Sequence, residues 1–225
     1  MWNTINNLSA GGKVAYDKAF DYFQYYFPFN KDSDIECINI DDNIEDYDNL
    51  QIEKYKNEKA HKRILPPVGL MEEYGTFFTA PTHIIDNIYL GSAFNAASYQ
   101  SLKDLNIKVI FNITKEISNY YPNEFIYNRF NIYDNNKHSM GQYLEKVYQD
   151  IRYHQDNTEG NILIHCYMGA SRSASVLIYY IMKTQKKDNG DYYSFDDALN
   201  FIKKKRTIIN PTFRFTKDLA KSMIG

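Results

Sequence analysis

The sequence predicts an α/β fold in which helices cover both faces of a mostly parallel central sheet. Short apolar segments alternate along the chain with longer segments whose apolar residues recur every three or four positions, as in β-α-β units. Two of the short segments, KVIFNI (108–113) and NILIH (161–165), lack the alternation of apolar and polar residues that half-exposed strands show. Strands buried on both faces of a parallel sheet have this composition.

The first elements of this fold lie between residues 83 and 133. HIIDNIYLG (83–91) predicts either a pair of short strands or one strand followed by a turn. NAASYQSLKDLNI (95–107) predicts a helix, which leads into the buried strand 108–113. FIYNRFNIY (125–133) predicts a further strand, because it is rich in aromatic and β-branched residues.

A long helix is predicted over SMGQYLEKVYQDIRYHQ (139–155). Gln142 follows Ser139 by three positions, the spacing of a capping box, so we expect the helix to open at Ser139. The apolar positions on one face of this helix are Met140, Leu144, Val147 and Ile151. We expect that face to cover the sheet.

Two more helices are predicted after the strand 161–165. SRSASVLIYYIMKT (171–184) is mostly apolar, which predicts a buried helix. SFDDALNFIKKKRT (194–207) begins with acidic and ends with basic residues, the order that the helix dipole favours. The basic end has two interpretations, a solvated complement to the dipole or a phosphate-binding patch: Lys203, Lys204, Lys205 and Arg206.

The N-terminal part of the chain differs in composition from the rest. We divide the chain into an extension, residues 1–78, and a main domain, residues 79–225. GGKVAYDKAFDYFQYYFPF (11–29) predicts an aromatic-rich helix, and an acidic, then basic linker with few large apolar residues follows at 30–63. So much aromatic surface needs a partner, so we expect the helix to pack on the main domain or on a second copy, forming a homodimer.

The composition excludes several classes of protein. The 225 residues carry a net charge of −2, too little positive charge to predict nucleic-acid binding, and no apolar run is long enough for a membrane span. The two cysteines, Cys37 and Cys166, are far apart, which favours a reducing compartment, the cytoplasm or the nucleus, over a disulfide framework. No CxxC or HExxH motif is present, and we expect neither metal nor cofactor.

The functional prediction centres on the junction between strand 161–165 and helix 171–184. Cys166 directly follows the strand, and Arg172 lies six positions later, in the first turn of the helix. A short loop at a helix start turns its backbone N–H groups toward an anion, and arginine can clamp two phosphate oxygens. The predicted phosphate-binding residues are those of the loop together with Arg172: Tyr167, Met168, Gly169, Ala170 and Ser171.

The same position favours a reactive cysteine. A helix N-terminus and a neighbouring cation stabilise the thiolate of Cys166, and Ser173 can donate a hydrogen bond to the sulfur. A thiolate at the floor of a phosphate cradle can attack phosphorus in line, forming a cysteinyl-phosphate that water later releases. Most unpaired cysteines are buried and inert, but that interpretation leaves Arg172 unexplained, because arginine is rarely buried without a partner.

These residues carry a resemblance to a known family. HCYMGASRSA (165–174) resembles the signature of dual-specificity protein phosphatases, in the cysteine-based protein tyrosine phosphatase superfamily. NIYLGSAFNAAS (87–98) resembles the family's early strand and turn, and RTIINPTFRFTKDL (206–219) resembles its closing block. The resemblance covers about residues 83–220 and implies a protein tyrosine phosphatase-like fold, a catalytic domain over 79–225, and phosphorylated proteins as partners.

The resemblance also implies a general acid, an aspartate about thirty residues before the cysteine and just after a strand. Asp134 lies there, 32 positions before Cys166. The chemistry asks for such a group, because a tyrosine or serine oxygen leaves poorly as an anion. The weaker candidates lie on or beside predicted helices: Asp104, Asp150 and Asp156.

Three supporting residues follow from the same resemblance. His165 is expected to orient the cysteine loop by hydrogen bonding, and it can equally be a core histidine. Ser171 is expected to brace the loop, and Asn210 to tie the closing block to it.

Three functions remain open at this point. The first is a protein phosphatase acting on phosphotyrosine and on phosphoserine or phosphothreonine. The second is a lipid or RNA phosphatase of the same superfamily. The third is a module that binds phosphoproteins without catalysis. The neutral loop between Cys166 and Arg172 favours proteins over polyanionic lipids, and the presence of Cys166, Arg172 and Asp134 together favours an enzyme.

Overall fold

The computed structural model describes residues 79–134 and 139–222. Its elements are β1 (Thr82–Ile85), β2 (Ile88–Gly91), α5 (Ala93–Ala97), α6 (Tyr99–Asp104), β3 (Ile107–Asn112), β4 (Ile126–Arg129), α7 (Gly141–Asn157), β5 (Asn161–His165), α8 (Arg172–Thr184), α9 (Phe195–Lys203) and α10 (Phe213–Ser222). The predicted helix, linker and dimer contact of the extension fall within residues 1–78, outside the described residues, and stay predictions.

The sheet has five strands in the order β1-β2-β5-β3-β4. β1 pairs with β2 antiparallel, so the segment 83–91 is a strand pair. The other neighbours, β2 with β5, β5 with β3 and β3 with β4, are all parallel. The mostly parallel sheet predicted from the sequence is therefore confirmed. β5, which ends just before Cys166, lies at its centre.

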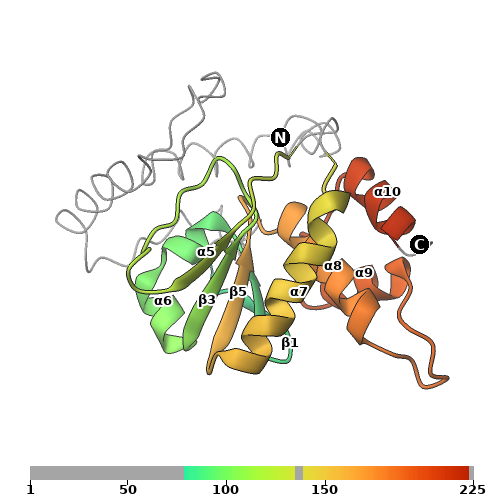
Figure 1. The fold of residues 1–225 in the computed structure, drawn as a ribbon, viewed down its shortest axis with the longest axis horizontal. Coiled ribbons are helices and arrows are strands. Elements are labelled where there is room, and N and C mark those ends of the chain that lie inside the picture. Colours follow the sequence, from blue (N-terminus) through green and yellow to red (C-terminus); the bar gives the residue numbers. More distant parts are fainter. Residues whose placement is uncertain (1–78, 135–138, 223–225) are drawn as a thin grey trace.

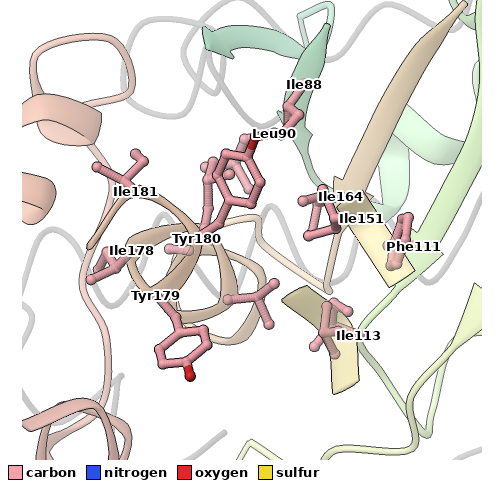
Figure 2. Close-up of a cluster of buried hydrophobic side chains, with 14 of the residues drawn as sticks. Ile88, Leu90, Phe111, Ile113, Ile151, Ile164, Ile178, Tyr179, Tyr180 and Ile181 are labelled. Atoms are coloured by element: carbon pink, nitrogen blue, oxygen red, sulfur yellow. The ribbon is translucent and has the colours of Figure 1, made fainter. Parts of the chain in front are cut away.

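Helices cover both faces of this sheet, as predicted (Figure 1). Side chains alternate between the faces, so Val109 and Phe111 of β3 join one core cluster and Ile110 joins the other. The larger cluster includes residues of α7, α8, α9 and α10, and the smaller one includes residues of α5 and α6. Figure 2 shows the larger cluster, where apolar side chains of β2, β3 and β5 face those of α8.

α8 is the central helix of the larger cluster. Every residue from Arg172 to Met182 is buried, as the apolar segment 171–184 predicted. Burial on all sides fixes the position of the first turn of the helix, which follows the cysteine loop directly. In the described part of the chain, neither α8 nor any other helix has the length and apolar character needed to cross a membrane.

Three predicted elements differ in length from those observed, and one is the helix expected over 194–207, which ends at Lys203 as α9. The helix expected over 95–107 is two short helices, α5 and α6, which meet at Ser98, whose backbone is not helical. Ser92 caps α5 through a capping box with Asn95. The strand expected over 125–133 ends at Arg129, because the backbone turns where Ile132 N donates to Phe130 O at 2.8 Å.

The predicted capping box at Ser139 is wrong. α7 begins at Gly141 without a side-chain cap of its own, and Ser139 instead donates to Asp218 at 2.9 Å. Asp218, from α10, also accepts a hydrogen bond from Met140 N at 2.9 Å. The carboxylate therefore caps α7 from a distant part of the chain. The apolar face predicted for α7 is buried as expected.

Candidate active site

Cys166 lies at the floor of the loop between β5 and α8. Its side chain is buried, with 1% of its surface exposed. The sulfur accepts hydrogen bonds from Gly169 N at 3.3 Å and from Ser173 Oγ at 3.1 Å. The bond from Ser173 is the one expected from the sequence. Two hydrogen-bond donors therefore converge on the sulfur of the candidate nucleophile.

Each backbone carbonyl from Cys166 to Ala170 accepts a hydrogen bond from a residue outside the loop. Cys166 O accepts from His165 Nδ1 (3.3 Å), Tyr167 O from Ala93 N (3.0 Å), Met168 O from Arg206 Nη2 (3.1 Å), Gly169 O from Arg206 Nε (3.0 Å) and Ala170 O from Asn210 N (2.9 Å). Because consecutive carbonyls are engaged on the outer side, the intervening N–H groups are left to face the inside of the curve. This arrangement is the one that the predicted anion-binding loop requires.

Gly169 allows the tight curvature of the loop. Its φ is +69°, a conformation that other residues rarely adopt. A Cβ atom there would lie 2.4 Å from Gly91 O and 2.8 Å from Arg206 Nη2. The loop therefore needs glycine for both conformation and space.

Arg206 supports the loop in a way that the sequence did not predict. Both interpretations of the basic segment, a solvated dipole complement and a phosphate patch, are wrong for this residue, because it is fully buried behind the loop. Its third contact runs from Nη1 to Thr82 Oγ1 at 3.2 Å. Burial lowers the pKa of Arg206 to about 10, so it keeps its charge at neutral pH. Lys203 to Lys205 are exposed at the end of α9.

Arg172 is fully buried at the start of α8, with its guanidinium among acceptors from two other loops. Glu116 accepts from Nη2 at 2.6 Å and from Nη1 at 2.8 Å, and Ile132 O accepts from Nη1 at 3.0 Å. Burial opposes the charge, but Glu116 and then Asp134 outweigh it and hold the pKa of Arg172 above its ordinary value. Arg172 is thus a permanent buried cation beside the cysteine loop.

Asp134 lies against both the loop and Arg172. Its Oδ1 accepts from Ser171 Oγ at 3.4 Å, and its Oδ2 lies 3.6 Å from Arg172 Nε. Ser171 Oγ in turn accepts from Thr212 N at 3.4 Å, which links the closing block to the same place. Cys166 and Arg172, from the junction of β5 and α8, and Asp134, from the segment after β4, therefore lie together at the carboxyl end of the sheet.

The supporting residues differ in how they contribute. Ser171 contacts the candidate acid through its side chain. Asn210 has an exposed side chain, and only its backbone N–H ties the closing block to the loop. Met168 is half-buried, whereas its four loop neighbours are buried.

Sequence reasoning missed Glu116. It lies in the loop 113–117 that follows β3, at the same edge of the sheet as Cys166. Its position just after a buried parallel strand could have indicated a residue of the site, because ligands bind at the carboxyl ends of such strands. The acidic side chain alone did not indicate which cation it would meet.

His165 makes the stability of the fold depend on pH. Complete burial lowers its pKa to about 4, so the ring is neutral in the folded protein. In the unfolded chain the histidine ring binds a proton near pH 6.5, whereas in the folded protein it does so only near pH 4. The neutral ring therefore contributes its full share to the free energy of unfolding above pH 6.5, and this share is lost as the pH falls toward 4. We expect about 2 kcal/mol of this contribution to disappear between pH 7 and pH 5.

Urea unfolding of the wild type and of His165→Asn at both pH values measures the effect. The asparagine keeps a donor for Cys166 O but does not titrate. The loss of unfolding free energy should be smaller in the variant by about 2 kcal/mol. Equal losses in the two proteins would contradict a buried neutral histidine.

Comparison with known proteins places this geometry in a family. The family model described as "Dual specificity phosphatase, catalytic domain" matches residues 88–223. Protein phosphatase Slingshot of Drosophila melanogaster is 37% identical over 141 residues, which cover 62% of this chain and 13% of that protein. A probable rhodanese domain-containing dual specificity protein phosphatase of Dictyostelium discoideum is 39% identical over 140 residues, 62% of this chain and 28% of that protein.

Solved structures have the same fold. The crystal structure of human DUSP28 matches with a TM-score of 0.57 at 20% identity, covering 63% of this chain and 91% of that one. The crystal structure of DUSP15 matches with a TM-score of 0.56 at 24% identity, covering 63% of this chain and 86% of that one. The family match spans more than half of the sequence and contains the strand, loop and helix around Cys166. The chain therefore belongs to the dual-specificity phosphatase family.

Proposed function

We propose that the protein hydrolyses phosphotyrosine, and also phosphoserine or phosphothreonine, in protein substrates. The matched segment is less than a third of each of the two curated relatives, so the activity is argued from the site. The observation that carries the proposal is the meeting of Cys166, Arg172 and Asp134 at one anion-binding loop. A thiolate, a cation and a carboxyl group around an anion site form the set of groups that phosphate-ester transfer to cysteine requires.

The first step transfers the phosphoryl group to Cys166. The amides of the loop and Arg172 bind the phosphate oxygens, and Sγ attacks phosphorus opposite the leaving oxygen. The S–P bond forms as the P–O bond breaks. Asp134, in its protonated form, gives its proton to the leaving oxygen, so that a neutral hydroxyl of tyrosine, serine or threonine departs.

The second step releases phosphate. A water molecule attacks the cysteinyl-phosphate while the Asp134 carboxylate takes one of its protons. The S–P bond breaks, and the electron pair returns to sulfur. Ser173 Oγ and Gly169 N, which donate to Sγ, stabilise the thiolate as a leaving group.

Two features favour proteins over lipids or RNA as substrates. The five residues between Cys166 and Arg172 are neutral, so the loop offers no cation for additional phosphate groups. Glu116 adds a negative charge beside Arg172, which disfavours polyanionic ligands. A non-catalytic binding module is disfavoured because the nucleophile, the cation and the acid are all present.

Turnover of phosphopeptides by the purified protein tests the proposal. Matched peptides carrying phosphotyrosine or phosphothreonine should both release phosphate, whereas a phosphoinositide and a 5′-phosphorylated RNA should react far more slowly. Phosphate released only from the lipid or the RNA would favour the second function. Phosphopeptide binding without release would favour the binding module.

Asp134→Asn should lower kcat by about 10²-fold or more on a phosphotyrosine or phosphothreonine peptide. The loss should be much smaller on an aryl phosphate whose leaving group is already a stable anion, because that group needs no proton. Steady-state kinetics on both substrates measure the difference. Equal losses would indicate that Asp134 acts through the structure of the loop, by its contacts with Ser171 and Arg172.

We also infer that the protein acts in a reducing compartment, the cytoplasm or the nucleus. Among the described residues Cys166 is a free thiol, and the proposed reaction consumes its reduced form. Activity that depends on a thiol reductant supports this inference, and full activity in an oxidising buffer argues against it.

A further inference from the structure

The phenyl group of Phe213 is exposed beside the phosphate-binding loop. Phe213 begins α10, and 81% of its surface is exposed, more than for any other large hydrophobic residue that the structure describes. We propose that Phe213 is a specificity-determining residue, which packs against the ring of a phosphotyrosine bound in the loop and so favours phosphotyrosine over phosphothreonine. The inference rests on the proposed function, because it concerns the substrate of the same site.

The residue before Phe213 contacts the loop directly. Thr212 N donates to Ser171 Oγ at 3.4 Å, and Phe213 is the next residue along the chain. Ser171 Oγ also donates to Asp134 Oδ1 at 3.4 Å, so Thr212 and the candidate acid meet the loop at the same hydroxyl group. In the proposed reaction Asp134 gives its proton to the leaving oxygen. Phe213 therefore lies on the side of the loop from which the leaving group departs.

The packing of α10 fixes this exposed position. Phe215 and Leu219 are fully buried in the larger core cluster. Phe215 follows Phe213 by two residues, about 200° around the helix axis, so Phe213 projects from the opposite side of α10. Thr216 N donates to Thr212 O at 3.0 Å and closes the first turn. The ring is therefore held beside the loop by the buried side of its helix, without being buried itself.

The exposed aromatic residue next to the candidate acid, Tyr133, differs from Phe213 in its contacts. The hydroxyl of Tyr133 accepts a hydrogen bond from Lys115, and Lys115 Nζ lies 4.7 Å from the centre of its ring. Phe213 has no polar atom in its side chain, and neither core cluster described above includes it. Single exposed apolar side chains are common on proteins, so the position of Phe213 beside the loop, more than its exposure, carries the inference.

Phosphotyrosine and phosphothreonine differ in the group that lies just outside the loop. In phosphotyrosine the ester oxygen is bonded to an aromatic ring, so a ring lies at the edge of the loop when the phosphate is bound. In phosphothreonine the same oxygen is bonded to an aliphatic carbon with one methyl group, and the peptide backbone follows directly. Phe213 therefore finds a ring to pack against only in phosphotyrosine, and such a contact is worth about threefold to tenfold in affinity.

Two variants at this position test the inference on matched peptides that carry phosphotyrosine or phosphothreonine between alanines. Phe213→Ala removes the ring and should lower the ratio of kcat/KM for phosphotyrosine to kcat/KM for phosphothreonine by about threefold to tenfold. The contact exists before and during the reaction, so the change should appear mainly as a higher KM for the phosphotyrosine peptide. Phe213→Tyr keeps the ring and should keep the ratio within about twofold of the wild type.

The matched control is Tyr192→Ala, which removes another exposed aromatic side chain. Tyr192 is 52% exposed and lies in the segment after α8, whose 13 residues separate it from the loop by about 20 Å. The control should change the ratio by less than about twofold. An unchanged ratio in Phe213→Ala, or an equal loss on both peptides, would overturn the inference, provided that thermal unfolding shows the variant to be folded.

Binding without turnover separates this inference from the proposed function. Titration calorimetry on Cys166→Ser, with and without Phe213→Ala, compares the phosphotyrosine peptide with inorganic phosphate. Phe213→Ala should weaken binding of the peptide about threefold to tenfold more than binding of phosphate. If this difference is found but the wild type hydrolyses no peptide, the proposed function fails and the role of Phe213 in binding is supported. If peptides are hydrolysed and the difference is absent, only the inference fails, and if the phosphotyrosine peptide does not bind, both fail.

Discussion

Cys166→Ser is expected to lower kcat by more than about 10⁴-fold, the order of loss that follows removal of an enzyme's nucleophile. The serine hydroxyl fits the space of the sulfur and keeps its neighbours, Gly169 N and Ser173 Oγ. It is not ionised at neutral pH, so it cannot attack phosphorus at a useful rate. Release of phosphate from a phosphotyrosine peptide measures the loss.

Two further observations make this result specific. The variant should still bind inorganic phosphate, because the loop amides and Arg172 are unchanged, and its thermal unfolding should stay close to that of the wild type. Wild-type protein quenched with acid during turnover should carry a phosphate group on Cys166, and the variant should carry none. Retention of even a tenth of wild-type activity would refute the covalent mechanism.

Arg172→Lys is the second change with a large expected effect, a loss in kcat/KM of about 10²–10³-fold. Lysine keeps the positive charge near Glu116, but its ammonium cannot donate two parallel hydrogen bonds to a phosphate or to a carboxylate. The variant loses the paired hydrogen bonds to phosphate and to Glu116. The inhibition constant of inorganic phosphate should therefore rise as kcat/KM falls.

Because lysine retains the positive charge, we expect the Arg172→Lys variant to stay folded, so its loss of activity is not caused by unfolding. A buried lysine still compensates Glu116, so the circular dichroism spectrum of the variant should match that of the wild type. A loss of less than about tenfold, in a folded protein, would show that charge suffices and that the planar geometry of Arg172 is not used.

Much of the site could be predicted because its parts are local in the sequence. Cys166 and Arg172 are separated by five residues between a strand and a helix, and that junction turns backbone N–H groups toward one point. Asp134 was predicted by a resemblance and by the need for a proton donor, and the structure brings it within 3.6 Å of Arg172. Hydrophobic patterning was likewise sufficient for other elements, because α7 has a periodic apolar face and β3, β5 and α8 are continuous apolar segments.

The differences arose where a distant residue decided a local feature. The capping box expected at Ser139 was wrong because Asp218, 78 residues beyond Met140, accepts from both Met140 N and Ser139 Oγ at the start of the helix. Arg206 was grouped with three lysines, although it is buried behind the loop and donates to carbonyls of Met168 and Gly169. Neither contact can be predicted from neighbouring residues, because each joins segments that are far apart in the sequence.

The sequence by itself therefore determined most of the strands and helices and their buried faces, and it predicted a chemistry for the cysteine loop. Only the tertiary structure decided which side chains hold that loop and which carboxylate contacts its arginine. Glu116 meets Arg172 across 56 residues because β3 and β5 are parallel neighbours, which brings the loops after both strands to one edge of the sheet. Parallel pairing depends on contacts between distant segments, and periodicity within each segment carries no record of them.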